Sequence, residues 1–118
     1  MVLNPKIIVF VMEITVNDSD FNKEVIEKSK TLPVLVDFWA TWCPPCRMLT
    51  PIVEEVAKEM KDKIIVAKAD TAVCPKICMD YEVQSIPSLK IFKGGKLVAE
   101  TVGFMPKAAL VDWIKKYI

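Results

Sequence analysis

The amino-acid sequence predicts an α/β fold in which helices flank a mixed central sheet. An almost continuous apolar run at residues 33–40 precedes a helical pattern at residues 43–60 and a second apolar run at residues 64–69. This order is typical of a right-handed βαβ unit, whose two strands are parallel. Further along the chain, Gly94 and Gly95 separate two strand-like segments, as in an antiparallel hairpin with a tight turn. The 118 residues are expected to form one domain.

The first elements are predicted from cap residues and from the spacing of apolar side chains. Residues 13–16 form a short candidate strand. Asn17 and its polar neighbours offer cap chemistry for a helix over residues 19–29. Residues 33–40 are predicted to be a strand buried on both faces, because they are nearly all apolar. Residues 43–60 are predicted to be a long helix, because their apolar side chains recur at spacings of three and four.

The elements of the second half follow from the same kinds of pattern. Residues 74–81 are predicted to form a short helix with Pro75 at its first position, where a missing N–H is tolerated. Residues 88–92 and 96–102 are the predicted strands of the hairpin. Residues 106–118 are expected to close the domain as a helix with apolar side chains along one side.

The N-terminal segment is not needed to complete this pattern. Residues 13–118 are predicted to form the whole domain and residues 1–12 an extension, although an extra strand or an interface segment is an alternative for the latter. The apolar run at residues 7–12 is shorter than a typical signal-peptide core and far too short to cross a membrane. We therefore expect a cytoplasmic protein without a membrane partner.

The composition excludes several classes of function. The 16 basic and 15 acidic residues nearly cancel, whereas a nucleic-acid binder needs a basic face, so no nucleic-acid partner is expected. The absence of histidine excludes Ser-His and Cys-His nucleophile pairs and histidine-ligated metals. No metal site is expected. Acid–base chemistry must then come from carboxylates, lysines or thiols.

Two cysteines, Cys43 and Cys46, directly follow the first buried strand and open the long helix. Thiols at this spacing can form a disulfide and break it again. The first thiol lies where helical N–H groups favour a negative charge, so it is suited to be a thiolate nucleophile. In the strand–helix–strand context, this Cys-x-x-Cys pair predicts redox chemistry. A pair of core cysteines or half of a zinc site is the alternative.

Four blocks of the sequence carry a resemblance to a known family. They are residues 34–40 with 42–48, residues 66–68 with Asp70, residues 85–89 with 92–95, and residues 102–103. In these blocks and in their order, the chain resembles the thioredoxin family. The resemblance implies a thioredoxin fold, with a five-stranded mixed β-sheet flanked by four α-helices. It also implies a protein-disulfide reductase that needs no cofactor beyond its own Cys43–Cys46 disulfide, with disulfide-containing client proteins and thioredoxin reductase or an equivalent dithiol donor as partners.

The residues between the two cysteines depart from the family pattern. The family usually has Gly-Pro there, and this chain has Pro44-Pro45. The intervening pair influences the strain of the disulfide and the stability of the thiolate, so we expect a shifted reduction potential. The alternative function within redox chemistry is therefore that of a protein disulfide oxidase or isomerase.

The resemblance assigns the catalytic roles. Cys43 would be the nucleophile and the more exposed thiol, and Cys46 would attack the mixed disulfide to release the reduced client. Asp37 lies in an otherwise apolar strand, so burial should raise the pKa of its carboxyl. A carboxyl that titrates near neutral pH can take the proton from Cys46. Lys68 would be its partner on the neighbouring strand, unless its side chain extends into solvent.

The resemblance also implies a surface for client proteins. Pro87 is expected to follow a cis peptide bond, which would let Ile86 offer its N–H and C=O groups to an extended client peptide. Trp42, Val102 and Gly103 would complete an apolar contact surface around the two cysteines. A trans turn proline is the alternative for Pro87.

A second pair of cysteines, Cys74 and Cys78, is not explained by the family pattern. Their spacing of four residues places them on one side of the short helix, with a Cα separation of roughly 6 Å. They are interpreted as inert packing residues, as a regulatory disulfide, or as part of a metal-binding module that uses all four cysteines. A further alternative for the whole chain is a redox-inactive subunit that serves another complex by its surface.

Overall fold

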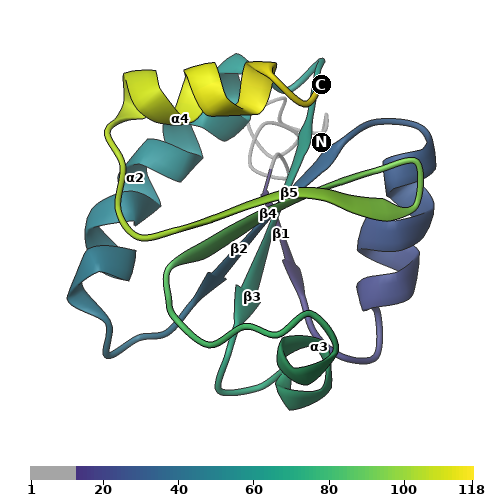
Figure 1. Ribbon diagram of the computed structural model, residues 1–118, viewed down its shortest axis with the longest axis vertical. Helices are drawn as coiled ribbons and strands as arrows, with labels where there is room; N and C mark the ends of the chain where they lie inside the picture. Colours follow the sequence, from purple (N-terminus) through teal and green to yellow (C-terminus); the bar gives the residue numbers. More distant parts are fainter. Residues whose placement is uncertain (1–12) are drawn as a thin grey trace, which may run out of the picture.

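A computed structural model describes residues 13–118, and the predicted extension at residues 1–12 lies outside the described residues. One five-stranded sheet has the strand order β1-β3-β2-β4-β5 (Figure 1). Strands β1 (Glu13–Val16), β3 (Ile65–Asp70) and β2 (Val34–Trp39) are mutually parallel. Strands β4 (Ser88–Lys93) and β5 (Lys96–Val102) are antiparallel to their neighbours. The mixed sheet of the predicted α/β class is confirmed.

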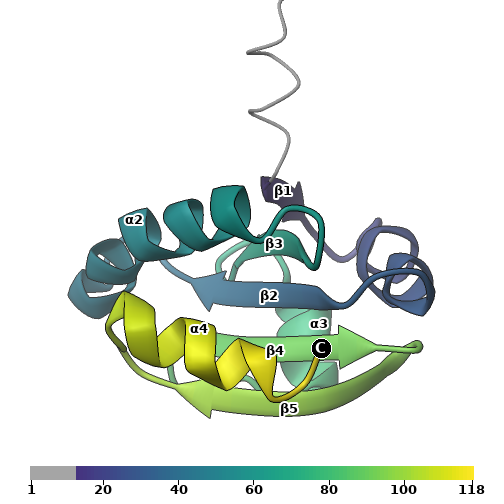
Figure 2. The ribbon, with the colours of Figure 1, turned by 90° about the horizontal axis from the view of Figure 1, so that it is seen from above.

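Helices cover both faces of the sheet, and Figure 2 shows the layers from above. Helices α2 (Pro44–Glu59) and α4 (Lys107–Lys115) pack on one face. The first helix, made of η2 (Asn22–Glu27) and η3 (Lys28–Lys30), packs on the other face together with α3 (Pro75–Asp80). Within residues 13–118, η2 and η3 taken as one helix together with α2, α3 and α4 make four helices, which confirms the expected number.

Strand β2 separates two hydrophobic cores because its side chains alternate between the faces. Leu35 joins the core under α2 and α4, where it packs with Leu49 and Leu110. Val36 and Phe38 join the core under the first helix and α3. The central strands are therefore buried on both sides, and the end of β2 is held firmly where the chain turns into α2.

The first helix differs from the regular α-helix that was predicted for residues 19–29. It is a π-helix over Asn22–Glu27 and a 3₁₀ helix over Lys28–Lys30. Asn17 caps the preceding turn as predicted, since its side-chain oxygen accepts N–H groups of Ser19 and Asp20. The tight last turn brings Ser29 to the β4–β5 hairpin, and this tertiary pairing outweighs α-helical geometry.

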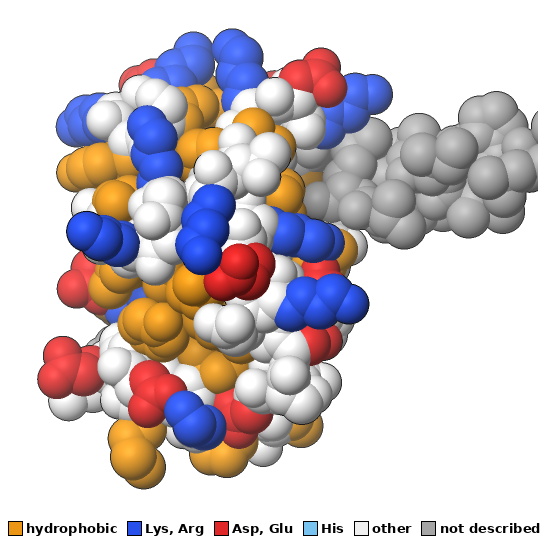
Figure 3. Space-filling model, turned by 90° about the vertical axis from the view of Figure 1, so that its right-hand side faces the viewer, with side chains coloured by type: hydrophobic (Ala, Val, Ile, Leu, Met, Phe, Trp, Pro, Cys, Tyr) orange, Lys and Arg blue, Asp and Glu red, His pale blue; other side chains and the backbone are white. Residues whose placement is uncertain are grey.

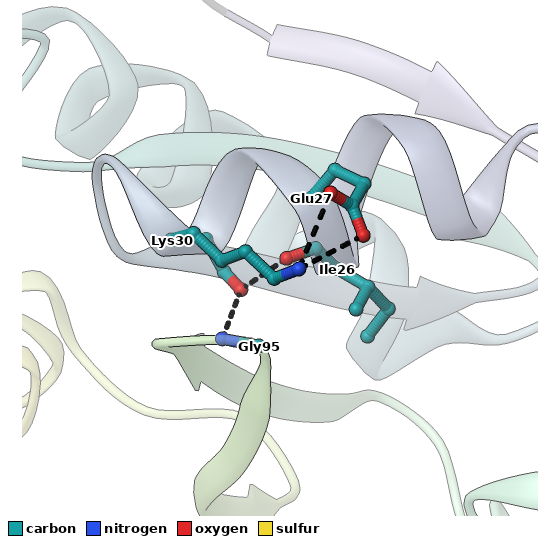
Figure 4. A network of polar contacts seen from close by, with 5 residues as sticks. Ile26, Glu27, Lys30 and Gly95 are labelled. Atoms are coloured by element: carbon teal, nitrogen blue, oxygen red, sulfur yellow. Dashed lines mark hydrogen bonds and ion pairs between the residues drawn. The ribbon is translucent and has the colours of Figure 1, made fainter.

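Ser29 makes three hydrogen bonds, of which two tie the first helix to the hairpin. Its hydroxyl donates to the carbonyl of Ile26 at 2.7 Å and accepts the N–H of Gly95 at 2.9 Å. Its carbonyl accepts the N–H of Gly94 at 2.8 Å. Figure 4 shows the hydroxyl's hydrogen bonds to Ile26 and Gly95, with Lys30 and Glu27 paired beside them. The hairpin turn is thus fixed against a helix distant in sequence.

The surface carries charges of both signs. Figure 3 shows Lys and Arg side chains among Asp, Glu and hydrophobic side chains on one face of the molecule. None of the helices within residues 13–118 is both long enough and apolar enough to span a bilayer.

Candidate active site

The site begins where β2 ends and α2 starts. Cys43 is the N-cap residue of α2, and a disulfide joins it to Cys46 with a Cα–Cα distance of 5.3 Å. The N–H of Cys46 points at the Sγ atom of Cys43, 3.3 Å away. This N–H is one of the donors at the helix start that have no intrahelical acceptor. It is placed to stabilise negative charge on the Cys43 sulfur when the disulfide is open.

Both cysteines are largely buried in the disulfide form. Cys43 retains 4% of its accessible surface and Cys46 retains 1%. Cys43 is therefore the more accessible of the two, as expected, but by a small margin. Ala40 and the partly buried side chains of Trp39 and Ile86 pack around the pair.

Two prolines shape the first turn of α2. Pro44 and Pro45 occupy its first two positions, so neither can supply an N–H to the Cys43 sulfur. The N–H of Cys46 is the first one along the helix that can do so. Arg47, in the same turn, donates from its guanidinium to the carbonyl of Thr41 at 2.8 Å, which fixes the loop before Cys43.

A second loop approaches the disulfide from the start of β4. The peptide bond between Ile86 and Pro87 is cis, which confirms the expectation. The carbonyl oxygen of Ile86 lies 3.9 Å from the Sγ atom of Cys43. Gly103 donates its N–H to the carbonyl of Pro87 at 2.8 Å, so the loop after β5 is joined to the same place. The structure thus brings together three segments that are distant in the sequence.

Exposed apolar side chains belong to these segments. Trp42, next to Cys43, is 71% exposed, and Val102, next to Gly103, is 59% exposed. Gly103 has a φ of 99°, a backbone conformation that residues other than glycine rarely adopt. Trp39 differs from Trp42, since it packs beneath the cysteines.

Asp37 is a buried carboxylate at the middle of the sheet. It is 1% exposed, and its Oδ1 atom has no hydrogen-bond partner among residues 13–118. It shares the α2 face of β2 with Leu35, because side chains two residues apart point the same way. Burial raises the pKa of Asp37 from 3.8 to about 6, as the sequence predicted.

Lys68 is the residue of β3 that pairs with Asp37. Its ammonium lies 5.0 Å from the centre of the Trp39 ring, and no ion pair joins it to Asp37 in the part of the chain that the structure describes. It still acts on the carboxylate through space, since its charge lowers the pKa of Asp37 against the larger effect of burial. Lys68 is half-buried, with its ammonium over the Trp39 ring.

Glu13 is a member of this group that sequence reasoning missed. Burial raises the pKa of its carboxyl, the charge of Lys68 lowers it, and Glu13 in turn raises the pKa of Asp37. Its position on β1, across Val66 of β3, places it on the same face as Lys68. The sequence could have indicated that Glu13 shares a face with Lys68 only if the pairing of β1 with β3 had been known.

The second cysteine pair lies apart from the first. Cys74 and Cys78 are free thiols in the core under α3, on the opposite face of the sheet from α2. Within residues 13–118, no three His, Cys, Asp or Glu side chains are arranged to hold a metal ion. The alternative in which all four cysteines form one metal-binding module is therefore wrong, because the two pairs do not converge.

Comparison with known proteins agrees with this arrangement. The family model described as Thioredoxin matches residues 12–116. A thioredoxin of Rickettsia felis is 48% identical over 103 residues, which cover 87% of this chain and 96% of that protein. A thioredoxin of Pyropia yezoensis is also 48% identical over 103 residues, with 87% and 94% of the two chains covered.

A chloroplastic M-type thioredoxin of Chlamydomonas reinhardtii is 46% identical over 103 residues, which cover 87% of this chain and 72% of that protein. The match to the family model spans all the elements that build the site, from β1 to α4. The chain belongs to the thioredoxin family of thiol–disulfide oxidoreductases, and Cys43 and Cys46 form its Cys-x-x-Cys disulfide.

Proposed function

We propose that the protein reduces disulfides of client proteins, with Cys43 as the attacking thiolate and Cys46 as the resolving thiol. The observation that carries this proposal is the position of Cys43 as N-cap of α2, with the Cys46 N–H 3.3 Å from its sulfur. A helix N-terminus and a directed N–H lower the pKa of a thiol and favour the thiolate.

The reaction runs in two exchanges. In the reduced protein, the Cys43 thiolate attacks one sulfur of the client disulfide, and the other client sulfur leaves and takes up a proton. Cys46 then attacks Cys43 in this mixed disulfide, so the second client sulfur leaves as a thiol and the Cys43–Cys46 bond forms. Two electrons pass from the protein to the client.

Asp37 serves the second exchange. Cys46 must lose its proton to attack, and a carboxylate whose pKa is about 6 is ionised at neutral pH and can accept it. Lys68 and Glu13 adjust the pKa of Asp37 in opposite directions. Lys68 is in this sense a positioning residue, because it acts through Asp37.

Clients dock on the apolar surface made by Trp42, Ile86, Pro87, Val102 and Gly103. An extended peptide can pair with the backbone of Ile86 while its side chains cover the exposed Trp42 and Val102. The distance of 3.9 Å between the Ile86 carbonyl oxygen and the Cys43 sulfur supports this docking site, because a peptide bound to Ile86 would lie next to the proposed nucleophile.

The reduced form is regenerated by a dithiol donor, for which a thioredoxin reductase is the proposed partner. We place this cycle in the cytoplasm, where thiols are kept reduced. Pro44 and Pro45 leave Cys46 as the first N–H donor of the helix, so we assign them the tuning of the reduction potential. Equilibration with glutathione would distinguish a reductase from an oxidase or isomerase.

Reduction of insulin by dithiothreitol, followed by turbidity, tests the proposal. Cys43→Ser should abolish the acceleration, whereas Cys46→Ser, reduced beforehand and mixed with insulin in the absence of dithiothreitol, should accumulate a mixed disulfide that non-reducing electrophoresis detects. Wild-type rates in the Cys43→Ser variant, or accumulation of the adduct on Cys46 in that variant, would overturn the assigned order of attack.

A further inference from the structure

Two thiols outside the active site are close to one another. The Sγ atoms of Cys74 and Cys78 are 3.9 Å apart, and neither cysteine is used in the chemistry proposed above. A disulfide requires the sulfurs to approach to about 2.05 Å with Cα atoms no more than about 6.8 Å apart. A spacing of four residues at a helix start gives a Cα separation of roughly 6 Å, which lies within that range.

The backbone at Cys74 removes the usual obstacle to such a bond. On an intact helix, the Cβ atoms of residues four apart point in the same direction, which is unfavourable for a disulfide. Helix α3 begins at Pro75, however, and Cys74 precedes it with φ −133° and ψ 62°, outside the helical region. The direction of its side chain is therefore not fixed by the helix, and it already points at Cys78.

We propose that Cys74 and Cys78 form a second, reversible disulfide, which opens and closes independently of Cys43–Cys46. Cys78 is the attacking thiol and Cys74 the resolving thiol. The oxidant is a low-molecular-weight disulfide of the glutathione type.

The two thiols differ in access. Cys78 is half-buried, whereas Cys74 is 0% exposed and donates its S–H to the carbonyl of Asp70 at 3.0 Å. A dissolved disulfide can therefore reach Cys78 first. Burial raises the pKa of Cys74 to about 12 and also raises the pKa of Cys78, so the order of attack follows from the access of Cys78 and not from its ionisation.

The exchange balances in two steps. The deprotonated Cys78 attacks one sulfur of the oxidant, forming a mixed disulfide, and the other half of the oxidant leaves as a thiolate that takes up the proton lost by Cys78. Cys74 then attacks the Cys78 sulfur, and the second half leaves as a thiol with the proton of Cys74. The two protein thiols lose two electrons, and the oxidant becomes two thiols.

Trypsin digestion gives a readout that separates the two disulfides. Lys76 lies between Cys74 and Cys78, so cleavage leaves them on two peptides, residues 69–76 and 77–90. Cys43 and Cys46 remain on one peptide, residues 31–47. The reduced full-length protein is incubated with glutathione disulfide, blocked with iodoacetamide, digested without reductant and analysed by mass spectrometry.

The expected result is a cross-linked pair of peptides 69–76 and 77–90 that disappears after dithiothreitol. The same pair is expected in Cys43→Ser/Cys46→Ser, in which only the α3 cysteines remain. Cys74→Ser should carry glutathione on Cys78, and Cys78→Ser should leave Cys74 unmodified. Alkylated, uncrosslinked peptides in the wild type, or a persistent glutathione adduct on Cys78, would overturn the second disulfide.

Failure of this proposal is distinguishable from failure of the reductase function. Cys74→Ser/Cys78→Ser is expected to reduce insulin at the wild-type rate, because neither thiol contacts Cys43 or Cys46. Faster modification of Cys74 in Cys78→Ser than of Cys78 in Cys74→Ser would contradict the order of attack.

Discussion

Asp37 and Lys68 occupy paired positions on β2 and β3, yet the ammonium of Lys68 lies over the Trp39 ring and not on the carboxylate. Asp37 is thereby left buried with its Oδ1 atom lacking a partner within residues 13–118. An ion pair would hold the pKa of Asp37 low, whereas this arrangement allows burial to raise it to about 6. The carboxyl can then change its protonation state near neutral pH.

The first prediction concerns the pH dependence of client reduction. If ionised Asp37 accepts the proton of Cys46, turnover falls as the pH drops through about 6. Lys68→Met removes a charge that lowers the pKa of Asp37, so this acidic limb should move to higher pH. Glu13→Gln removes a charge that raises it, so the limb should move to lower pH.

Lys68→Met and Glu13→Gln serve as controls for each other, since they should shift the acidic limb in opposite directions. Insulin reduction is measured from pH 5 to 8, and the pKa of Asp37 is followed by carboxyl-carbon NMR in the oxidised form. Shifts of the NMR pKa without matching shifts of the rate profile would show that Asp37 is not the proton acceptor.

The second prediction concerns stability. The folded-state pKa of Asp37 is raised, so the unfolded chain gives up its proton at lower pH than the folded chain does. Ionisation of Asp37 therefore does not lower the free energy of unfolding below about pH 3.8, where the carboxyl is protonated in both states. It lowers that free energy by its full amount above about pH 6. Asp37→Ala should raise the free energy of unfolding by about 1 to 3 kcal/mol at pH 7.5, after allowance for a small cavity.

Urea denaturation at two pH values tests this explanation. At pH 7.5 the variant should be more stable than wild type, and at pH 4 the gain should largely vanish. The same variant should reduce insulin more slowly at pH 7.5. A gain of equal size at both pH values would mean that ionisation of Asp37 is not its cause.

The fold was largely predictable because its patterns are local. Apolar runs, the glycine pair and the position of Pro75 gave the strands, the hairpin and α3 close to their observed bounds. The wide and tight turns of the first helix were not predictable, because the contact of Ser29 with Gly95 depends on tertiary structure. The role of Glu13 near Asp37 and the position of Lys68 over Trp39 could not be predicted either, because they depend on which strands pair and local sequence patterns do not indicate that.

The third prediction tests the docking surface. Trp42 is 71% exposed beside Cys43, and an exposed aromatic side chain at an interface often contributes a large share of binding. Trp42→Ala should lower kcat/KM for insulin by about tenfold, which corresponds to about 1.4 kcal/mol. Val98→Ala is the matched control, since Val98 is 41% exposed on β5 and lies outside the proposed surface. Equal losses in both variants would contradict a specific role for Trp42.

The fourth prediction compares two buried serines. Ser29 and Ser88 are 2% and 1% exposed, but the Ser29 hydroxyl makes two hydrogen bonds and the Ser88 hydroxyl makes none within residues 13–118. Ser29→Ala leaves the N–H of Gly95 without its acceptor, so it should lower the free energy of unfolding by about 1 to 2 kcal/mol. Ser88→Ala removes a buried hydroxyl that has no partner to lose, so stability should stay the same or rise slightly. Both are measured by urea denaturation of the oxidised protein, and a larger loss for Ser88→Ala than for Ser29→Ala would show that the helix–hairpin hydrogen bonds do not hold the hairpin in place.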